Sequence, residues 1–107
     1  MTNALRELGR FAEPSLHILV SLSDGPKHGY AIMTDVEAIS GAAMGPGTLY
    51  GALARLEQRG LIEALEPEER RRPYRLTALG ATTLQAQLLL LNSFVRTGLS
   101  RLEKKQA

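Results

Sequence analysis

The chain has 107 residues, a formal net charge of +2 and no cysteine, which fits one small domain with a helical appendage. Without cysteine it can have no disulfide framework and no cysteine-based metal or redox site, and two histidines alone cannot hold a zinc ion. We find neither a signal-peptide pattern nor an apolar run of membrane-spanning length. We therefore expect a soluble cytoplasmic protein without a metal or cofactor.

Residues 1–12 carry Leu5, Leu8 and Phe11 at helical spacing. This spacing predicts a short amphipathic helix, which by itself would bury little surface. Its apolar stripe is therefore expected to contact a later helix or a second subunit.

Two scaffold helices are predicted next, over residues 14–23 and 29–39. Pro14 suits the first turn of a helix, and an Asp-Gly-Pro cluster at residues 24–26 breaks the chain between the two segments. Apolar residues recur in both segments at intervals of three and four, so each helix has one face for a core.

Three polar side chains of this region are candidates for special roles. Tyr30 lies in a first helical turn, where unpaired backbone N–H groups attract anions, so its hydroxyl either contacts a phosphate or closes over the core. His28 is expected to be a capping or turn residue. His17 lies in an apolar helix and is expected to be a core or interface histidine rather than a ligand.

A third helix is predicted within residues 45–62, with clear signals at both ends. Pro46 suits the first helical position, and Gly60 suits the left-handed position just past the end. One face carries a leucine stripe, and the other carries Thr48, Gly51 and Arg55. A mid-helix glycine costs about 1 kcal/mol relative to alanine, so Gly51 is either a tolerated weak spot or a point where a partner approaches closely.

A hairpin follows, with short strands predicted over residues 61–65 and 73–77 from the alternation of apolar and polar residues. The loop between them is highly charged and ends in three arginines. By itself such a run is most often a solvated loop. If the preceding helix, within residues 45–62, is a DNA-recognition helix, however, the arginines of this loop can reach phosphates or the minor groove of the DNA.

The last predicted helix runs from an N-cap at Thr77 to about residue 104. Its apolar residues alternate by four and three, as in a coiled-coil seam, and others make the helix apolar on most sides. Pairing with a second copy, to give a two-fold dimer, is the simplest way to cover this surface. The expected dimer contacts are Leu5, Leu8, Leu84, Leu88, Leu91, Val95 and Leu102.

Together these elements predict a mainly α fold with a small β-hairpin: a winged helix-turn-helix plus a C-terminal dimerisation helix. The expected units are a short N-terminal helix over residues 1–12, a DNA-binding domain over residues 13–77 and the dimerisation helix over residues 78–107. Six arginines and five glutamates lie between residues 55 and 75, so a basic footprint must come from their arrangement.

Three motifs in this order and spacing resemble the PadR family of transcriptional regulators: GPKHGY at residues 25–30, GTLY at 47–50 and RPYRLT at 72–77. The resemblance covers about residues 16–80, and the single leucine-rich helix that follows is similar to the smaller subfamily, which dimerises through that helix. It implies a repressor that binds operator DNA as a homodimer. In the family, ligands such as phenolic acids or hydrophobic drugs can relieve repression, often by binding near the dimer interface.

The chain departs from the family pattern at three points. Gly51 stands where the family often has proline, which leaves the recognition helix less rigid. The hairpin over residues 61–77, which forms the wing of the predicted fold, carries Glu68-Glu69-Arg70-Arg71 in place of a glycine-rich tip. The chain has no tryptophan, so an aromatic sandwich for flat drugs cannot be built on that residue.

The expected function is a transcriptional repressor on an inverted-repeat operator, with half-sites about one helical turn apart. The candidate DNA-binding residues are Tyr30, Gly47, Thr48, Tyr50, Gly51, Arg55, Arg70, Arg71 and Arg72. A pocket for a small hydrophobic or phenolic effector is expected between the first helix and the partner's last helix. Its candidate lining residues are Phe11, Ser15, Asn92, Ser93 and Phe94.

The mixed charge of the wing leaves an alternative, a winged-helix ligand-binding or protein-interaction module without DNA binding. An enzyme is not expected, because the chain has no recognisable Ser/His/Asp arrangement, no phosphate-cradling glycine loop and no defined carboxylate pair. The glycines at residues 45 and 47 precede a helix but follow no predicted strand, so they are not a nucleotide fingerprint.

Overall fold

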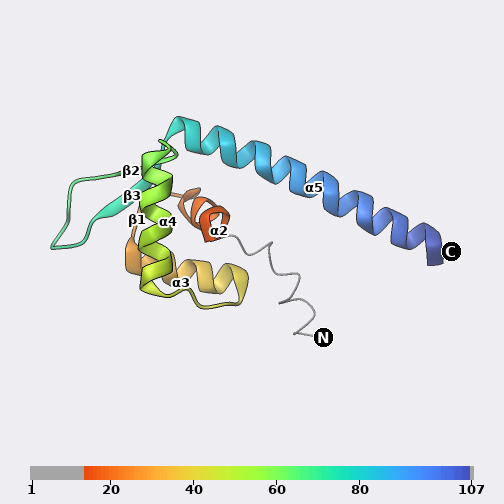
Figure 1. Cartoon of the computed structure of the whole chain (residues 1–107), viewed down its shortest axis with the longest axis horizontal. Coiled ribbons are helices and arrows are strands. Elements are labelled where there is room, and N and C mark those ends of the chain that lie inside the picture. The colour runs from red at the N-terminus through yellow and green to blue at the C-terminus, as the bar shows by residue number, and fades with distance from the viewer. Residues whose placement is uncertain (1–13, 107) are drawn as a thin grey trace.

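The computed structural model describes residues 14–106, in which helices and a small sheet surround one core and a long helix leaves them as an arm (Figure 1). The mainly α fold with a small β-sheet agrees with the sequence prediction. The helix expected over residues 1–12, with Leu5, Leu8 and Phe11, lies outside the described residues. In chain order the elements are α2 (Pro14–Leu22), β1 (Lys27–His28), α3 (Gly29–Ser40), α4 (Pro46–Gln58), β2 (Ile62–Ala64), β3 (Pro73–Leu76) and α5 (Ala78–Gln106).

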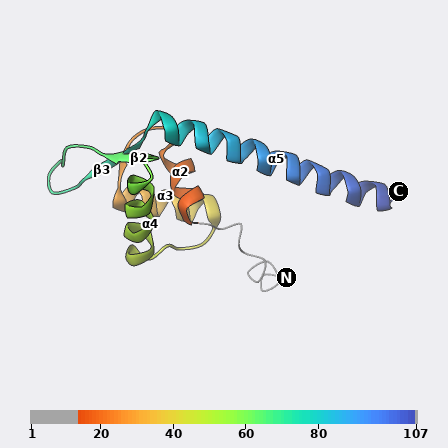
Figure 2. The same ribbon diagram turned by 45° about the horizontal axis from the view of Figure 1, so that its top comes forward.

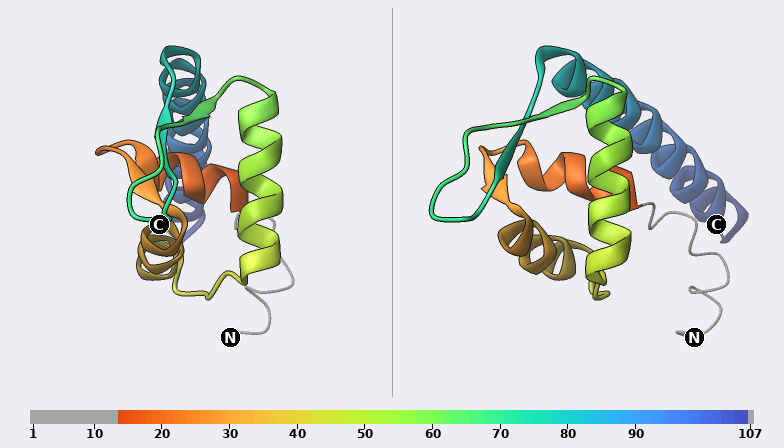
Figure 3. Two further views of the ribbon diagram at one scale, coloured as in Figure 1. Left: turned by 90° about the vertical axis from the view of Figure 1, so that its left-hand side faces the viewer. Right: turned by 60° about the vertical axis from the view of Figure 1, so that its left-hand side comes forward.

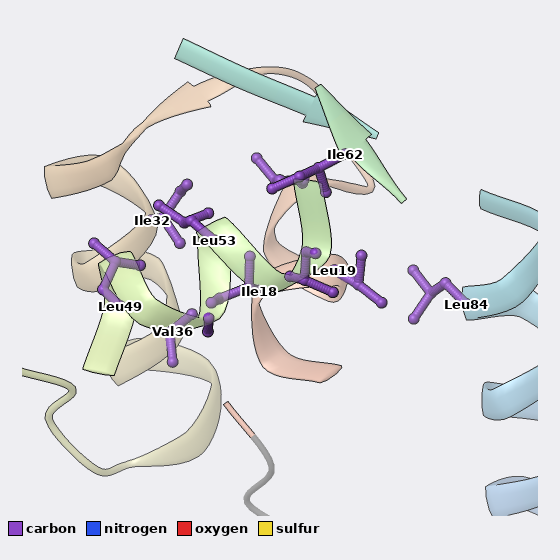
Figure 4. Packing of buried hydrophobic residues seen from close by; sticks show 11 residues of the cluster. Ile18, Leu19, Ile32, Val36, Leu49, Leu53, Ile62 and Leu84 are labelled. Carbon is purple, nitrogen blue, oxygen red and sulfur yellow. The ribbon is translucent and has the colours of Figure 1, made fainter. Parts of the chain in front are cut away.

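Helices α2, α3 and α4 pack against one another through a single apolar core (Figure 4). Ile18 of α2, Ile32 of α3 and Leu53 of α4 are almost completely buried there. Fully burying one such side chain contributes about 1.5–3 kcal/mol, so this cluster holds the three helices together. The other members are Leu19, Leu22, Val36, Leu49, Ala52, Leu56, Ile62 and Leu84.

Helix α4 has the start and the end that its sequence predicts. Pro46 is its first residue, and Gly60 has a φ of +76° just past its end. The N–H of Gly60 donates to the carbonyl of Glu57, and the N–H of Leu61 donates to the carbonyl of Leu56, each at 3.0 Å. This pair of bonds is a Schellman motif, which satisfies the last carbonyls of the helix and turns the chain into the hairpin.

The strands form an antiparallel sheet in the order β1-β3-β2. In the β2–β3 pair, Glu63 lies opposite Arg75, and the two side chains form an ion pair with an N–O distance of 2.5 Å. On the other edge of β3, His28 lies opposite Pro73. The sequence pattern does not predict β1, because two residues carry no periodicity and their pairing partner lies far along the chain.

The end of α4, the base of the hairpin and the start of α5 meet at one junction. Thr77 caps α5 as predicted, since its Oγ1 accepts from the N–H of Gly80 at 3.0 Å and donates to the carbonyl of Gly60 at 2.6 Å. The N–H of Thr77 donates to the carbonyl of Leu61 at 3.1 Å. A Cβ at Gly80 would lie 1.9 Å from that same carbonyl oxygen. Only glycine lets α5 pass this close.

Helix α5 has 29 residues, about 44 Å at 1.5 Å per residue, and most of it projects from the domain (Figure 2). Its first two turns pack on the domain, where Leu84 is only 4% exposed and belongs to the core of its own chain. The prediction that Leu84 is a dimer contact is therefore wrong, because a side chain buried within one chain cannot cover a partner. Leu79 is exposed in the first turn, and beyond Leu84 the large exposed apolar side chains start at Leu88.

By length and composition, α5 is also long and apolar enough to cross a membrane. This corrects the expectation that the chain holds no such run. Exposed amides at Gln85, Gln87 and Asn92 interrupt its apolar surface, and polar groups are costly to place in hydrocarbon without a partner. The helix is therefore better suited to pairing with protein than to a lipid environment.

Replacing Gly80 with alanine should destabilise the domain, because the added Cβ meets a backbone carbonyl that cannot move alone. We expect the free energy of unfolding to fall by about 1–3 kcal/mol, the usual cost of overpacking, in urea denaturation followed by circular dichroism. Gly47, in the first turn of α4, has open space around it and provides a matched control. Gly47→Ala should leave stability unchanged or raise it by up to about 1 kcal/mol. Equal stability of the two variants would contradict the close contact at the junction.

Candidate DNA-binding surface

Helix α4 exposes its polar side to solvent. Its leucines point into the core, so Thr48 and Arg55 are exposed and Gly51 is half-buried between them. The guanidinium of Arg55 folds back along the helix, with its Nη1 3.6 Å from where a Cβ at Gly51 would lie. That is an ordinary contact distance. The fold itself therefore does not require glycine at this position, and both hypotheses for Gly51 stay open.

The tip of the wing is a two-residue turn flanked by Glu68 and Arg71. The N–H of Glu68 donates to the carbonyl of Arg71 at 2.6 Å, and the N–H of Arg71 donates back at 2.8 Å. The central residues Glu69 and Arg70 have φ values of +48° and +72°, as in a type I′ turn, for which Asn-Gly is the preferred sequence. A left-handed conformation costs a residue other than glycine about 1–2 kcal/mol, so this tip is not the most stable sequence for its turn.

The wing arginines differ in what they contact. Arg70 is exposed and makes no hydrogen bond to another residue of the described part of the chain. The Nη1 of Arg71 lies 3.3 Å from Nε2 of His28, and Arg72 donates to the carbonyl of Leu65 at 3.1 Å. Arg72 is thus fixed at the base of the loop, Arg71 lies beside α3, and Arg70 is free to meet a partner.

These arginines border a cleft of about 380 Å³ between the wing, the start of α3 and α4. In both views of Figure 3 the hairpin loop projects beyond the sheet, beside the start of α3. Tyr30 is 70% exposed here, so the interpretation that it closes over the core is wrong. No carboxylate lines the cleft. Its lining residues are His28, Gly29, Tyr30, Tyr50, Arg70, Arg71, Arg72 and Tyr74.

Tyr50 of α4 lines this cleft and contacts the start of α3. Its hydroxyl lies so close to Gly29 that a Cβ there would be 2.5 Å away. Tyr74 of β3 lies next to it, and burial raises the pKa of Tyr74 above its usual value, with Glu57 and Tyr50 acting in the same direction and Arg72 against it. The Tyr74 phenol therefore stays protonated at neutral pH and can donate a hydrogen bond.

Two acidic residues of the wing line a different cleft. Glu66 and Glu68 border it together with Pro26, Lys27 and His28, which also lines the first cleft, and no residue of α4 contributes to it. Glu69 lies beside Arg70 at the tip of the turn. Along the loop the glutamates come before the arginines, and the fold places Glu66 and Glu68 at one cleft and the three arginines at the other. The charged residues that line the cleft between the wing, α3 and α4 are therefore all arginines, even though the total charge of the region is nearly balanced.

Within residues 14–106, the candidate effector residues are not brought together in one pocket. Ser15 is half-buried on α2, whereas Asn92, Ser93 and Phe94 are exposed on the projecting part of α5. Phe11 lies outside the described residues. An effector pocket between two subunits therefore stays a prediction. Within residues 14–106, no group of three or more His, Asp or Glu side chains is placed to hold a metal ion.

Residues 18–86 match the family model described as the transcriptional regulator PadR-like family. The chain belongs to this family. A PadR-like protein is a transcriptional regulator and not an enzyme, and the helix-turn-helix and wing described above are the parts that bind DNA in such a regulator.

Two curated proteins are similar to this PadR-like chain. A transcriptional regulator from Mycobacterium tuberculosis is 36% identical over 95 residues, which cover 86% of this chain and 87% of that protein. An uncharacterised 37.1 kDa protein in a transposon of Streptomyces fradiae is 46% identical over 78 residues, which cover 73% of this chain. The chain spans only 23% of the length of the transposon protein.

Solved structures show the same fold. A PadR family transcription regulator from Clostridium difficile is 26% identical, with a TM-score of 0.72 and coverage of 81% of this chain and 94% of that one. Bacillus subtilis PadR in complex with operator DNA is 23% identical, with a TM-score of 0.63 and coverage of 70% and 46%. At that identity the second likeness supports the fold alone.

The cleft contains three residues that the sequence did not assign to a site, His28, Gly29 and Tyr74. They lie in the motifs at residues 25–30 and 72–77, which indicated the family but no role for these residues. Only the pairing of β1 with β3 brings His28 to Arg71, and such long-range pairing leaves no local pattern in the sequence.

Replacing Glu69 with asparagine and Arg70 with glycine should stabilise the domain, because the pair suits the type I′ turn. We expect the free energy of unfolding in urea to rise by about 1 kcal/mol. Arg72→Gly is the control. Because Arg72 does not have a positive φ, this substitution should not raise the free energy of unfolding. A double variant that is no more stable than the parent would contradict the turn assignment.

Proposed function

We propose that the chain is a repressor that binds an inverted-repeat operator as a homodimer in the cytoplasm. The observation that carries this proposal is the separation of charge in the wing: its arginines lie beside α4 and the start of α3, and Glu66 and Glu68 line another cleft. In a winged helix-turn-helix, the recognition helix reads bases while the wing contacts the flanking backbone. The basic cleft lies where those contacts would be made.

In this proposal α4 enters the major groove, with Thr48 and Arg55 toward base edges or phosphates. Gly47 and Gly51 lack side chains and let the helix backbone approach the DNA closely. Tyr50 positions the helix on the DNA backbone.

The wing and the start of α3 contact the flanking phosphates in the same proposal. Arg70 reaches furthest because it is held at the tip of the turn and is free of other contacts in the described chain. Tyr30 is exposed beside it and offers a hydroxyl. The fold shared with a PadR that was solved on its operator supports this placement.

The projecting part of α5 supports the homodimer. Exposed apolar patches of this kind on small proteins commonly mark interaction sites, and α5 carries a seam of period seven. A second copy of the same helix covers it with two-fold symmetry, which in turn predicts two symmetric half-sites in the operator. The large exposed apolar residues of this part are Leu88, Leu89, Leu90, Phe94, Val95, Leu99 and Leu102.

A small hydrophobic or phenolic effector would act at this dimer. A ligand that favours one relative orientation of the two subunits shifts the spacing of the two α4 helices and so changes operator affinity. Ser15, Asn92, Ser93 and Phe94, with Phe11, are the proposed lining.

Replacing the three wing arginines with alanine should weaken binding to DNA from the region upstream of the protein's own coding sequence. Log affinity falls as log salt concentration rises, and each lost arginine–phosphate contact makes this slope less steep by about one unit. We expect at least a tenfold loss of affinity and a slope smaller by up to about three units per protomer, measured by fluorescence anisotropy over a salt series.

The control for these variants replaces Arg96 and Arg101, which are exposed on α5 away from the cleft. That double variant should keep both the affinity and the slope. Random DNA of equal length tests sequence preference. If the triple wing variant binds with the parent's affinity and slope, the proposed role of the wing is wrong.

Replacing Leu88 and Val95 with aspartate should give a monomer, because two charges would be buried in the proposed seam. Sedimentation velocity at micromolar concentration measures this. The matched control is Thr97→Asp, since residue 97 lies on the side of the helix opposite residue 88. A dimer that survives both substitutions in the seam would place the subunit contact elsewhere.

A further inference from the structure

Gly98 is an unfavourable residue at its place in α5. It lies well inside this 29-residue helix, where glycine destabilises more than any residue except proline. Outside this stretch of helix, residues 14–106 place nothing within 4 Å of where a Cβ of Gly98 would lie. The domain therefore does not require glycine here, whereas at Gly80 a backbone carbonyl excludes a Cβ. The space at Gly98 is open to a second molecule.

Gly98 also belongs to the apolar seam of α5. Leu91, Val95, Gly98 and Leu102 follow one another at intervals of four, three and four residues, so they share one face of the helix. This series of intervals reads the same from both ends. If a second copy of the helix runs in the opposite direction, Leu91 of each chain therefore faces Leu102 of the other. In the same alignment, Val95 of each chain faces Gly98 of the other.

The start of α5 excludes a parallel pair. Leu84 lies on the face of the seam, two turns before Leu91, and its side chain points into the core of its own domain near Leu19 (Figure 4). In a parallel two-fold pair, both domains would have to occupy the space between the two helices at this level. Gly98 would also face its own copy and leave a void in the seam, and voids in apolar packing are destabilising. An antiparallel pair avoids both problems.

The burial of Leu84 also selects one antiparallel alignment. Moving the second helix toward the domain by one repeat of the seam would place its Leu102 opposite Leu84, where the domain already covers the helix. Moving it one repeat the other way would leave the exposed Leu88 uncovered. Only with the two-fold axis between Val95 and Gly98 does the whole projecting part of α5 pair with itself and stay clear of the domains.

We infer that two copies of this chain associate through antiparallel α5 helices that cross between Val95 and Gly98. This inference rests on the homodimer of the proposed function, and it adds the direction, the alignment and the point of closest approach. Crossing helices are nearest to each other at the crossing point, and the side chains there set their separation. Gly98 accommodates Val95 of the other chain at this point, and pairs of Leu91 with Leu102 fill the wider space on either side.

Pairs of introduced cysteines test the alignment, because the chain has no cysteine of its own. Leu91→Cys combined with Leu102→Cys should give an intermolecular disulfide under mild oxidation, seen by non-reducing gel electrophoresis. Each single variant should stay uncrosslinked, since the two copies of either residue are about 16 Å apart along the helix axis, beyond the reach of a disulfide. The matched control is Leu88→Cys combined with Leu91→Cys. It also carries two cysteines on the seam and should give no intermolecular bond.

Gly98→Leu tests the close approach at the crossing point. Leucine is a good helix former and suits an ordinary coiled-coil seam, so without a close approach this substitution would tighten the dimer. In the inferred dimer it meets Val95 of the other chain, and we expect the dissociation constant of the dimer to rise at least tenfold through overpacking. Sedimentation equilibrium measures this constant. Ser100→Leu is the matched control, because Ser100 is exposed on the side of α5 away from the seam and its substitution should leave the constant unchanged.

Three results would overturn the inference: an intermolecular disulfide in Leu91→Cys alone, no disulfide in the combination of Leu91→Cys with Leu102→Cys, or a tighter dimer of Gly98→Leu. The first result would mean a parallel pair, the second a different alignment, and the third that the helices are not close at Gly98. If the parent protein is a monomer at all concentrations, the homodimer of the proposed function itself fails. If the parent is a dimer and only these expectations fail, the proposed function stands.

Discussion

The close contact between Gly80 and the carbonyl of Leu61 is the constraint on which the rest of this structure depends. At that point the recognition helix has just ended, the hairpin begins and returns, and α5 departs. Thr77 links all three parts, because its backbone and side chain bond to Leu61, Gly60 and Gly80. The direction of the wing relative to α4 and the direction of the α5 arm are therefore set by one small group of atoms. A change in this group would move the candidate DNA-binding surface and the proposed subunit contact together.

The basic cleft shows how a fold can produce a charged surface from a sequence with little net charge. Along the chain, the wing glutamates at residues 66, 68 and 69 precede the arginines at residues 70–72. Antiparallel pairing of β3 with both β1 and β2 places the arginines at a cleft beside α3 and α4, whereas Glu66 and Glu68 line a second cleft. The type I′ turn helps, because its left-handed residues carry Arg70 to the tip even though they are not the most stable choice there. The tip therefore contains two residues in a costly conformation, and backbone strain of this kind is common at functional sites.

Helix α5 combines two different tasks along its length. Its first two turns complete the core of the domain through Leu84, while the remainder exposes apolar side chains such as Phe94 and Leu99 that residues 14–106 do not cover. The boundary between the folded core and the proposed subunit contact therefore lies inside the helix, not at its start. This continuity connects the proposed subunit contact to the junction at Gly80. In the proposed dimer it would link an effector between the subunits to the spacing of the two recognition helices.

The sequence by itself determined the helices, their caps and the family, because these depend on local patterns: the leucine stripe of α4, the glycine at residue 60, the threonine cap of α5 and three short motifs. It also identified the wing arginines as candidates. The sequence could not predict strand β1, the burial of Leu84 within its own chain or the place of His28 in the cleft. Each of these depends on contacts between residues far apart in the chain, which only the tertiary structure brings together.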